Sequence, residues 1–221
     1  RSLVGSEMCI RDRKERKRRS IRTASLKDAA ERQAFSLAID AALKSLNKDR
    51  EKALLNIVNL VQKFMGNNFR KESYEGAKKM IMNPDHKWMR YVNRLLDETD
   101  PHVAKMTALN LGYQAAFAGT KKIRKMREVE QCNIPWLILM DPTSACNLHC
   151  TGCWAAEYGH KLNLSYEELD NIITQGKELG IYFYMMTGGE PLVRKADIIK
   201  LCEKHNDCAF PVSYTHLTLP T

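Results

Sequence analysis

The chain has 221 residues, a formal net charge of +9 at pH 7, and a composition that is 44% hydrophobic and 28% charged. This length allows one or two domains. The sequence has no apolar run long enough to span a membrane and no signal peptide with an apolar core, so we expect a cytoplasmic protein without a membrane partner. Its seven cysteines, three of them close together, indicate thiols and metal ligands rather than a disulfide framework.

The two ends of the chain look foreign to the rest. Residues 1–13 and 212–221 resemble translated sequencing-adapter sequence, which recurs at the ends of metagenomic genes. We expect both stretches to be artefacts of that kind rather than genuine tails, and to have no part in the fold. On this interpretation the natural protein continues beyond Pro211, and the chain is a fragment.

Most of the positive charge lies in one short run. Residues 11–22 hold eight basic and two acidic side chains, which accounts for six of the formal +9. Such a run can bind nucleic acid or an anionic surface. No aromatic side chain interleaves with it, so stacking on bases is not favoured. We therefore interpret it as a solvated leader.

Residues 14–131 are expected to form a helical N-terminal region, because apolar residues recur there at helix spacing. Asp49 is a plausible N-cap. Asn83-Pro84 and Asp100-Pro101 are typical of the N-cap and first position of a helix. Gly119 is expected to separate the last two helices.

This helical region carries no residues that point to chemistry. His86 and His102 lie near helix starts and are expected to cap helices or lie at the surface. The Met and aromatic residues are expected to face the core. The region could be a separate domain, a substrate-binding cap or a docking surface. The apolar positions of the helix after Pro84 are Trp88, Tyr91, Val92, Leu95 and Leu96.

Three cysteines follow an apolar run that predicts a short buried strand. Cys146, Cys150 and Cys153 have the spacing C-x3-C-x2-C. A disulfide would use two thiols and leave the third exposed, so we expect all three to converge on one metal centre. Soft thiolates suit an iron–sulfur cluster or zinc. Zinc would need a fourth ligand, for which His149 or His160 is near in sequence, and the spacing alone leaves both metals open.

A helix and a second strand follow the cysteines. Ser165 and Glu168 form a capping box, and Gly180 is a stop signal. The apolar residues after Gly180 predict a strand that ends in residues 187–191, Thr-Gly-Gly-Glu-Pro. Strand, helix and strand together predict a right-handed βαβ unit. Because both loops would follow the carboxyl ends of parallel strands, where α/β proteins place ligands, we expect them to lie together.

One more helix and the start of a third strand are expected beyond this unit. The helix covers 196–205, with Cys202 as a small buried residue. The third strand covers 208–211. The single cysteines Cys132, Cys202 and Cys208 have ordinary spacing and do not indicate a second cluster.

The three cysteines after one strand, with Gly-Gly-Glu-Pro after the next, resemble the radical S-adenosylmethionine (SAM) enzyme superfamily. The resemblance covers about residues 135–211. It implies a [4Fe-4S] cluster held by three cysteines, with SAM chelating the open iron through its amino and carboxylate groups. The resemblance assigns Cys146, Cys150 and Cys153 as metal ligands, and Gly188, Gly189 and Glu190 as cofactor-binding residues that contact SAM.

The resemblance also implies a fold and a reaction. The fold would be α/β: a helical N-terminal region, then the first β/α units of a partial, incomplete (β/α)6-type radical SAM barrel over residues 132–211. The reaction would be reductive cleavage of SAM to a 5′-deoxyadenosyl radical, driven by a one-electron reductant such as flavodoxin or ferredoxin. The substrate, whether a peptide, a small-molecule cofactor precursor or RNA, would be read by later strands, so the fragment alone could lack activity.

One position departs from the family pattern. The family usually has an aromatic residue just before the third cysteine, near the adenine, whereas this chain has Gly152 there and Trp154 just after. The departure concerns the adenine contact and not the cluster.

Two other functions compete with this one. In the first, Cys146, Cys150, Cys153 and a histidine hold zinc, and the chain is an interaction module whose helical region binds a partner. That interpretation explains Gly-Gly-Glu-Pro only as a turn. In the second, the basic run and the helices bind RNA, which the charge run alone supports.

Overall fold

The computed structural model describes residues 26–46, 48–65, 70–153 and 161–212. The basic run, residues 1–13 and 213–221, and the segment with Trp154 and His160 lie outside these ranges, so the predictions made for them stay predictions. The described residues form two units, Leu26–Leu109 and the residues from Asn110 onward. No helix within the described ranges combines the length and apolar content needed to cross a bilayer.

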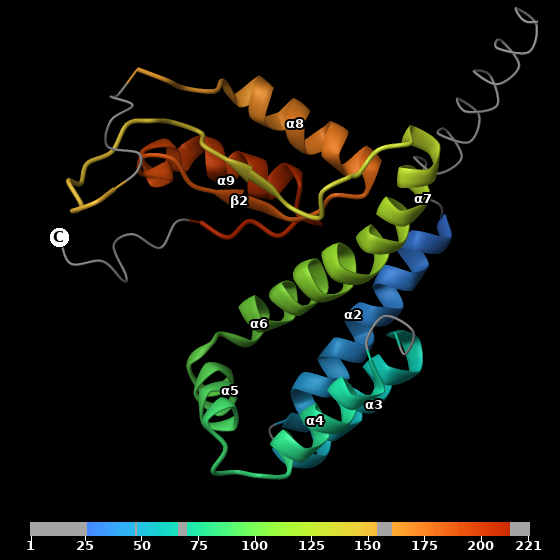
Figure 1. Ribbon diagram of the computed structural model, residues 1–221. Helices are drawn as coiled ribbons and strands as arrows, with labels where there is room; N and C mark the ends of the chain where they lie inside the picture. The colour runs from blue at the N-terminus through green and yellow to red at the C-terminus, as the bar shows by residue number, and fades with distance from the viewer. Residues whose placement is uncertain (1–25, 47, 66–69, 154–160, 213–221) are drawn as a thin grey trace, which may run out of the picture. The chain divides into compact units, whose positions relative to one another are not determined.

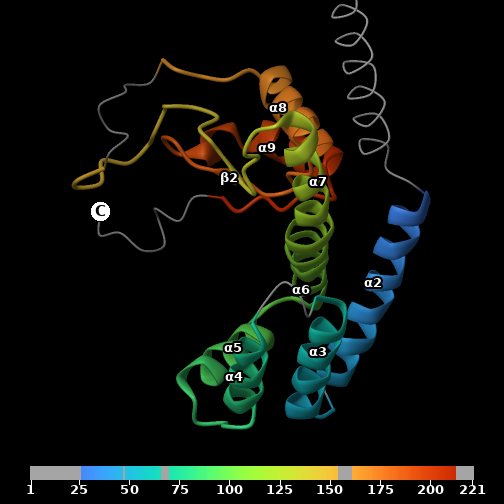
Figure 2. The ribbon, with the colours of Figure 1, turned by 45° about the vertical axis from the view of Figure 1, so that its right-hand side comes forward.

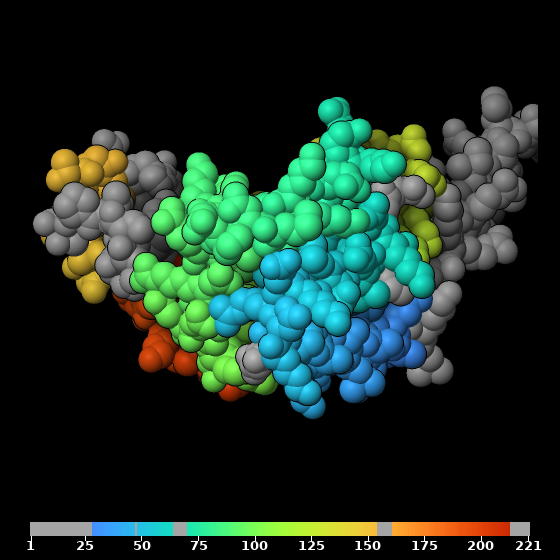
Figure 3. Space-filling model, turned by 90° about the horizontal axis from the view of Figure 1, so that it is seen from below, coloured from blue at the N-terminus to red at the C-terminus, as the bar shows by residue number. Residues whose placement is uncertain are grey.

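The first unit is built of α-helices: α2 (Leu26–Leu46), α3 (Arg50–Met65), α4 (Lys71–Ile81), α5 (Lys87–Glu98) and α6 (Pro101–Thr107). Asp49 and Asp100 each accept backbone N–H groups at a helix start, which confirms both predicted caps. An ion pair of 2.6 Å between Arg50 and Asp97 joins α3 to α5. Figure 3 shows these helices in space-filling form, coloured blue to green.

The start of α5 differs from the prediction. Asn83 and Pro84 lie in a turn, in which the Asn83 side chain accepts the N–H two residues on at 3.2 Å. The helix begins only at Lys87, and His86 is its N-cap, with Nδ1 accepting the N–H of Trp88 at 3.3 Å. The prediction that Asn83 and Pro84 are the N-cap and first position of this helix was therefore wrong, because an asparagine side chain can accept a backbone N–H in a turn as well as at a helix start. The capping role expected of His86 is confirmed.

The apolar face expected to pack into the core from α5 is largely exposed. Trp88, Tyr91 and Leu95 are 55%, 58% and 50% exposed, and Met89 is the buried residue of this helix. The rings of Trp88 and Tyr91 pack edge to face with their centroids 6.2 Å apart. The core prediction was wrong for Trp88 and Tyr91, because helical spacing shows which residues share a face but not whether the face is covered.

The chain enters the second unit through a continuous helical stretch. The π-helix Ala108–Gly119 follows α6 and runs directly into α7, Thr120–Glu130. Gly119 has right-handed helical angles, so it marks a change of hydrogen-bonding pattern and not the predicted separation. Gln131, with φ 56°, ends α7 in the left-handed conformation.

The second unit contains the predicted βαβ unit. The strands β1 (Ile138–Met140) and β2 (Tyr184–Met186) are parallel, and α8 (Tyr166–Leu179) connects them. Figures 1 and 2 show α8 and α9 (Lys195–Lys204) beside β2. The architecture is therefore mixed, with a small parallel sheet among helices. The core residues of this unit are Ile123, Met126, Ile134, Met140, Leu169, Ile173, Ile181, Tyr184, Met186, Leu201 and Cys208.

Helix α8 begins and ends where its sequence signals predict. The Ser165 hydroxyl accepts the N–H of Glu168 at 3.1 Å, and the Glu168 carboxylate accepts the N–H of Ser165 at 2.7 Å. Gly180 follows the helix with φ 100°. Leu169 and Ile173 are fully buried, so this helix packs against the core along the face that carries them. The capping box and the stop signal are both confirmed.

Residues 209–212 lie along the other edge of β2. Tyr184 donates its N–H to the carbonyl of Ala209, and Met186 donates to that of Pro211, both at 3.0 Å. The bridges are parallel but isolated, so the predicted third strand is present in direction and position without a full ladder. Pro211 contributes to this because it has no N–H to donate.

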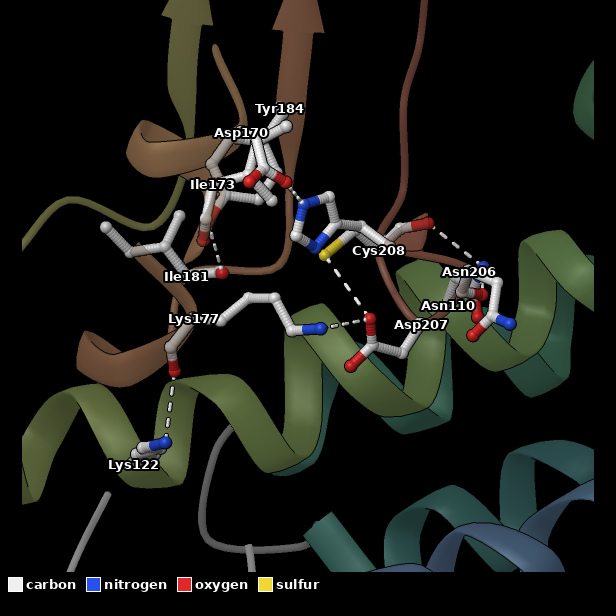
Figure 4. Close-up of polar contacts among 11 residues, drawn as sticks. Asn110, Lys122, Asp170, Ile173, Lys177, Ile181, Tyr184, Asn206, Asp207 and Cys208 are labelled. Carbon is white, nitrogen blue, oxygen red and sulfur yellow. Dashed lines mark hydrogen bonds and ion pairs between the residues drawn. The ribbon is translucent and has the colours of Figure 1, made fainter. Parts of the chain in front are cut away.

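Polar side chains join the helices at the amino-terminal end of this sheet. Figure 4 shows Lys177 paired with Asp207, at 2.6 Å, and the Tyr184 hydroxyl directed to backbone carbonyls of the α8 region. The Asp170 carboxylate meets Lys204 at 2.7 Å and the Nε2 of buried His205 at 2.8 Å. Asp170 therefore ties α8 to the end of α9.

Asp170 is expected to make folding sensitive to acid. The ammonium of Lys204, and after it His205, hold the pKa of Asp170 below its ordinary value of 3.8. A carboxylate with a lowered pKa stabilises the fold above its ordinary value, and this contribution is lost as the pH falls through the lowered pKa. The free energy of unfolding, measured in urea from about pH 7 to about pH 3, should fall less steeply in Asp170→Asn than in wild type. Parallel profiles would contradict the prediction.

Candidate functional site

The cysteine loop (residues 141–153) and the Gly-Gly-Glu loop (residues 187–190) leave the carboxyl ends of β1 and β2 and run side by side. The predicted proximity of the two loops is confirmed. Ala145, whose carbonyl accepts the N–H of Glu190, directly precedes Cys146, so the Gly-Gly-Glu loop is bonded to the residue before the first cysteine. Three backbone hydrogen bonds join the Gly-Gly-Glu loop to the end of β1 and to the cysteine loop: Thr187 N–H to Met140 O (2.8 Å), Gly189 N–H to Thr143 O (3.0 Å) and Glu190 N–H to Ala145 O (2.8 Å).

The two glycines allow this close approach. Gly188 has a φ of +101°, and a Cβ at this position would lie 2.7 Å from the carbonyl oxygen of Thr143. A Cβ on Gly189 would overlap the carbonyl oxygen of Ala145. Any larger residue would have to push the two loops apart. The structure thus explains both glycines by their packing on the backbone of the cysteine loop.

An open groove of about 680 Å³ lies at the same edge of the sheet. Gly188 and Gly189 line it from one loop and Thr143 and Ser144 from the other, and residues 139–141 and 161–164 also line it. Its position beyond the carboxyl ends of parallel strands is where α/β proteins place ligands. Within the described ranges, its lining includes the two glycines but none of the three cysteines.

Glu190 is 6% exposed and caps the short helix that follows it. Its Oε1 accepts the N–H of Leu192 at 3.0 Å, at the start of the 3-10 helix η3 (Pro191–Arg194). The carboxylate is therefore held close to its own backbone. Its predicted contact with SAM stays a prediction.

The cysteine loop is closed at its base by antiparallel pairing with residues 162–164. Ser144 donates its N–H to the carbonyl of Leu162 at 2.8 Å, and Leu164 donates to that of Pro142 at 3.1 Å. The Ser144 hydroxyl also accepts the N–H of Leu162 at 3.0 Å. We call residues 142–144 and 162–164 the loop base. All three cysteines lie between its two sides.

The cysteines differ in exposure and lie on irregular backbone. Cys150 is buried, whereas Cys146 and Cys153 are partly exposed. The N–H of Cys153 bonds to the carbonyl of Cys150 at 3.2 Å, closing a turn in which Gly152 has a φ of +73°. This is the pattern of a type II turn, whose third position favours glycine. The turn gives a physical reason for glycine at position 152, where the family that the sequence resembles usually has an aromatic residue.

The structure does not gather the three thiols around one point. Among the residues that it describes, no group of three or more His, Cys, Asp and Glu side chains is placed to hold a metal ion. The donors themselves fit a cluster, because three thiols lie on one loop with a closed base. Metal binding often orders the loop that carries its ligands, so the sulfurs would converge on loading. His149, a candidate zinc ligand, is exposed. The cluster and the zinc assignments both stay predictions.

Two polar residues at this edge had no role in the sequence-based prediction. The Thr187 hydroxyl donates to the Asp141 carboxylate at 2.6 Å, which adds a side-chain link between the two loops. Each is the first residue after its strand. That placement is the signal that could have identified them, because the residues after neighbouring parallel strands meet at one edge.

A parallel βαβ unit with a cysteine loop and a Gly-Gly-Glu loop at its strand ends defines a class of protein. Residues 140–219 match the sequence profile of the Radical SAM superfamily.

The chain is similar to several GTP 3',8-cyclases. Identity is 47% over 57 residues with the one from Geobacter sulfurreducens, 46% over 56 residues with that of Alkaliphilus oremlandii, and 41% over 66 residues with that of Desulforamulus reducens. These stretches are 24%, 24% and 28% of this chain and 18%, 18% and 20% of the relatives. The chain therefore matches about a fifth of the length of these relatives. No solved structure matches the chain.

Proposed function

We propose that residues 132–211 are the first part of a radical SAM core that binds a [4Fe-4S] cluster and SAM. The parallel sheet would be the beginning of a partial (β/α)6-type barrel. Cys146, Cys150 and Cys153 would hold three irons and leave the fourth open to SAM. When bound, the cluster would supply the electron for reductive cleavage of SAM.

The observation that carries this proposal is the backbone pairing of the two loops. The bond from Glu190 N–H to Ala145 O, 2.8 Å long, fixes the start of the cysteine segment against the Gly-Gly-Glu loop. Neither motif alone is specific, but a cluster with an open iron needs a site for SAM beside it. The backbone pairing holds the cysteine loop beside the Gly-Gly-Glu loop in the absence of any ligand.

The polar groups left to the Gly-Gly-Glu loop suit a ligand that donates N–H groups, such as an amino group. The N–H groups of Thr187, Gly189 and Glu190 are already bonded to carbonyls of β1 and the cysteine loop. A ligand at this loop would therefore meet mainly carbonyl and carboxylate oxygens, which are acceptors. The amino group of SAM is a donor, so the chemistry of the loop agrees with the proposed contact.

The remaining parts of the function are proposed at the level of class. The chain shares only about a fifth of its relatives' length, so we propose the cofactor chemistry and name no substrate. A one-electron reductant such as flavodoxin or ferredoxin would be needed, and the cytoplasm would provide it.

Anaerobic reconstitution with iron and sulfide tests the proposal against the zinc module. We expect a brown protein with a broad absorption band near roughly 400 nm and about four irons per chain. Adding SAM should change the electron paramagnetic resonance signal of the reduced cluster, because SAM would occupy the open iron. A colourless protein that instead retains one tightly bound zinc would support the interaction module and contradict the enzyme.

A further inference from the structure

Arg194 connects four segments near the two loops: η3, α9 and the two sides of the loop base. It ends η3 and precedes α9, four residues after Glu190. Its Nη1 donates to the carbonyl of Pro142 at 3.1 Å and also to the carbonyl of Leu164. Its Nε and Nη2 donate to one carboxylate oxygen of Asp197, at 3.0 Å and 2.5 Å. Its side chain is 18% exposed.

The two carbonyls that Arg194 binds belong to the two sides of the loop base. Leu164 also donates its own N–H to Pro142, so the guanidinium adds to a backbone pair that is already formed. Arg194 itself is carried by the segment that begins with Glu190. The guanidinium therefore connects both sides of the loop base to the segment that follows the Gly-Gly-Glu loop.

Arginine suits this position and lysine does not. A guanidinium has five N–H donors in a fixed plane, and here four of its hydrogen bonds run in two directions. Lysine has its donors on one nitrogen, so it could keep the ion pair with Asp197 or reach the carbonyls, but not both. Position 194 therefore requires the planar shape of a guanidinium as well as its positive charge.

We propose that Arg194 is a positioning residue that fixes the base of the cysteine loop relative to the Gly-Gly-Glu loop. It acts through the Pro142 and Leu164 carbonyls and touches neither metal nor SAM. The inference rests on the proposed function only in that the cysteine loop would hold a cluster. The hydrogen bonds from Arg194 to Pro142 and Leu164, which we call the brace, are present in the cluster-free chain and can be measured there.

Hydrogen exchange of the cluster-free, 221-residue chain tests the brace in Arg194→Lys. We expect the amides of Ser144 and Leu164 to exchange about tenfold faster or more, because the loop base loses charge-assisted hydrogen bonds. The amide of Ile138, bonded to Phe183 at 3.0 Å between the strands, should exchange at its wild-type rate. Arg94→Lys, in an exposed ion pair with Glu98, is the matched control and should leave all three amides unchanged.

Asp197→Asn separates the brace from a simple helix-capping role. This variant keeps Arg194 and its two carbonyl contacts while it weakens the link to α9. If Arg194 positions the loop, Asp197→Asn should raise exchange at Ser144 and Leu164 by less than about threefold. Equal exchange in wild type and Arg194→Lys, or an equal effect of Arg194→Lys and Asp197→Asn, would overturn the proposal.

Reconstitution then shows whether the brace matters to the site. Arg194→Lys should bind as much iron as wild type but need several times more SAM to change the spectrum of the reduced cluster. A wild-type chain that takes up no cluster would defeat the proposed function and leave the exchange result standing. Unchanged SAM dependence in a loaded Arg194→Lys would show that the brace does not position the loop for SAM.

Discussion

Alanine in place of Cys146, Cys150 or Cys153 is expected to lower the iron bound after reconstitution from about four atoms per chain to below about one. The three thiolates would be the whole protein ligand set of the cluster. Removing one leaves two of the four irons without a protein ligand, and the cluster is then lost rather than weakened. Iron and sulfide assays on the desalted protein, with the absorption spectrum, measure the effect.

Two other cysteines provide the matched controls for this experiment. Cys132 is exposed and lies before β1, and Cys202 is partly buried in α9. Burial raises the pKa of the Cys202 thiol, which makes it a poor source of thiolate. Alanine at either position should leave the iron content unchanged. Iron retained in a Cys146, Cys150 or Cys153 variant at the wild-type level would remove that residue from the ligand set.

Gly189→Ala is expected to separate the two loops and destabilise the second unit. The new Cβ would overlap the Ala145 carbonyl and lie 2.7 Å from the carbonyl carbon of Ser144, which are both backbone groups. Relief of the overlap would weaken two backbone hydrogen bonds, from Gly189 to Thr143 and from Glu190 to Ala145. Overpacking and the lost bonds together should cost about 2–4 kcal/mol of unfolding free energy. Urea unfolding followed by circular dichroism measures this cost.

Gly112→Ala is the control for that substitution. Gly112 lies in the same unit, and a Cβ added there meets no atom within 4 Å. The helical conformation accepts alanine, so this variant should be as stable as wild type or slightly more stable. If Gly189→Ala were equally stable and kept wild-type exchange at the Glu190 amide, the close approach of the loops would not depend on this glycine.

Features encoded by neighbouring residues could be predicted from the sequence. The capping box of Ser165 and Glu168 and the stop at Gly180 depend on contacts within a few residues, and both are present. The βαβ unit follows from the order of its elements, and the strands are parallel as expected. The meeting of the two loops followed in turn from that topology.

Features that depend on distant contacts could not be predicted in the same way. The loop base pairs residues that flank the whole cysteine segment, and the side formed by residues 142–144 has no strand-like alternation in its sequence. Arg194 follows Gly-Gly-Glu-Pro as an ordinary basic residue, and only the fold brings Pro142 and Leu164 to it. The exposure of Trp88 and Tyr91 has the same origin, since their spacing contains no information about what packs on them.

The ligand set is the part where motif and structure differ most. The spacing of Cys146, Cys150 and Cys153 predicts a shared metal, whereas the described chain holds them on a loop without gathering them. Spacing limits how close three sulfurs can come, but the energy that brings them together belongs to the metal–sulfur bonds. A chain without metal therefore shows the loop base that supports such a site, but not the positions that the three sulfurs would take around a bound metal.

The closed loop base has a consequence for how such a protein would mature in the cell. The ladder from Ser144 and Leu164 is made of backbone bonds that need no iron, so the scaffold can form first. An iron–sulfur carrier protein would then insert the cluster into a chain whose loop base has already folded. If oxygen later destroyed the cluster, the loop base would stay folded, and a new cluster could be inserted without unfolding of the protein.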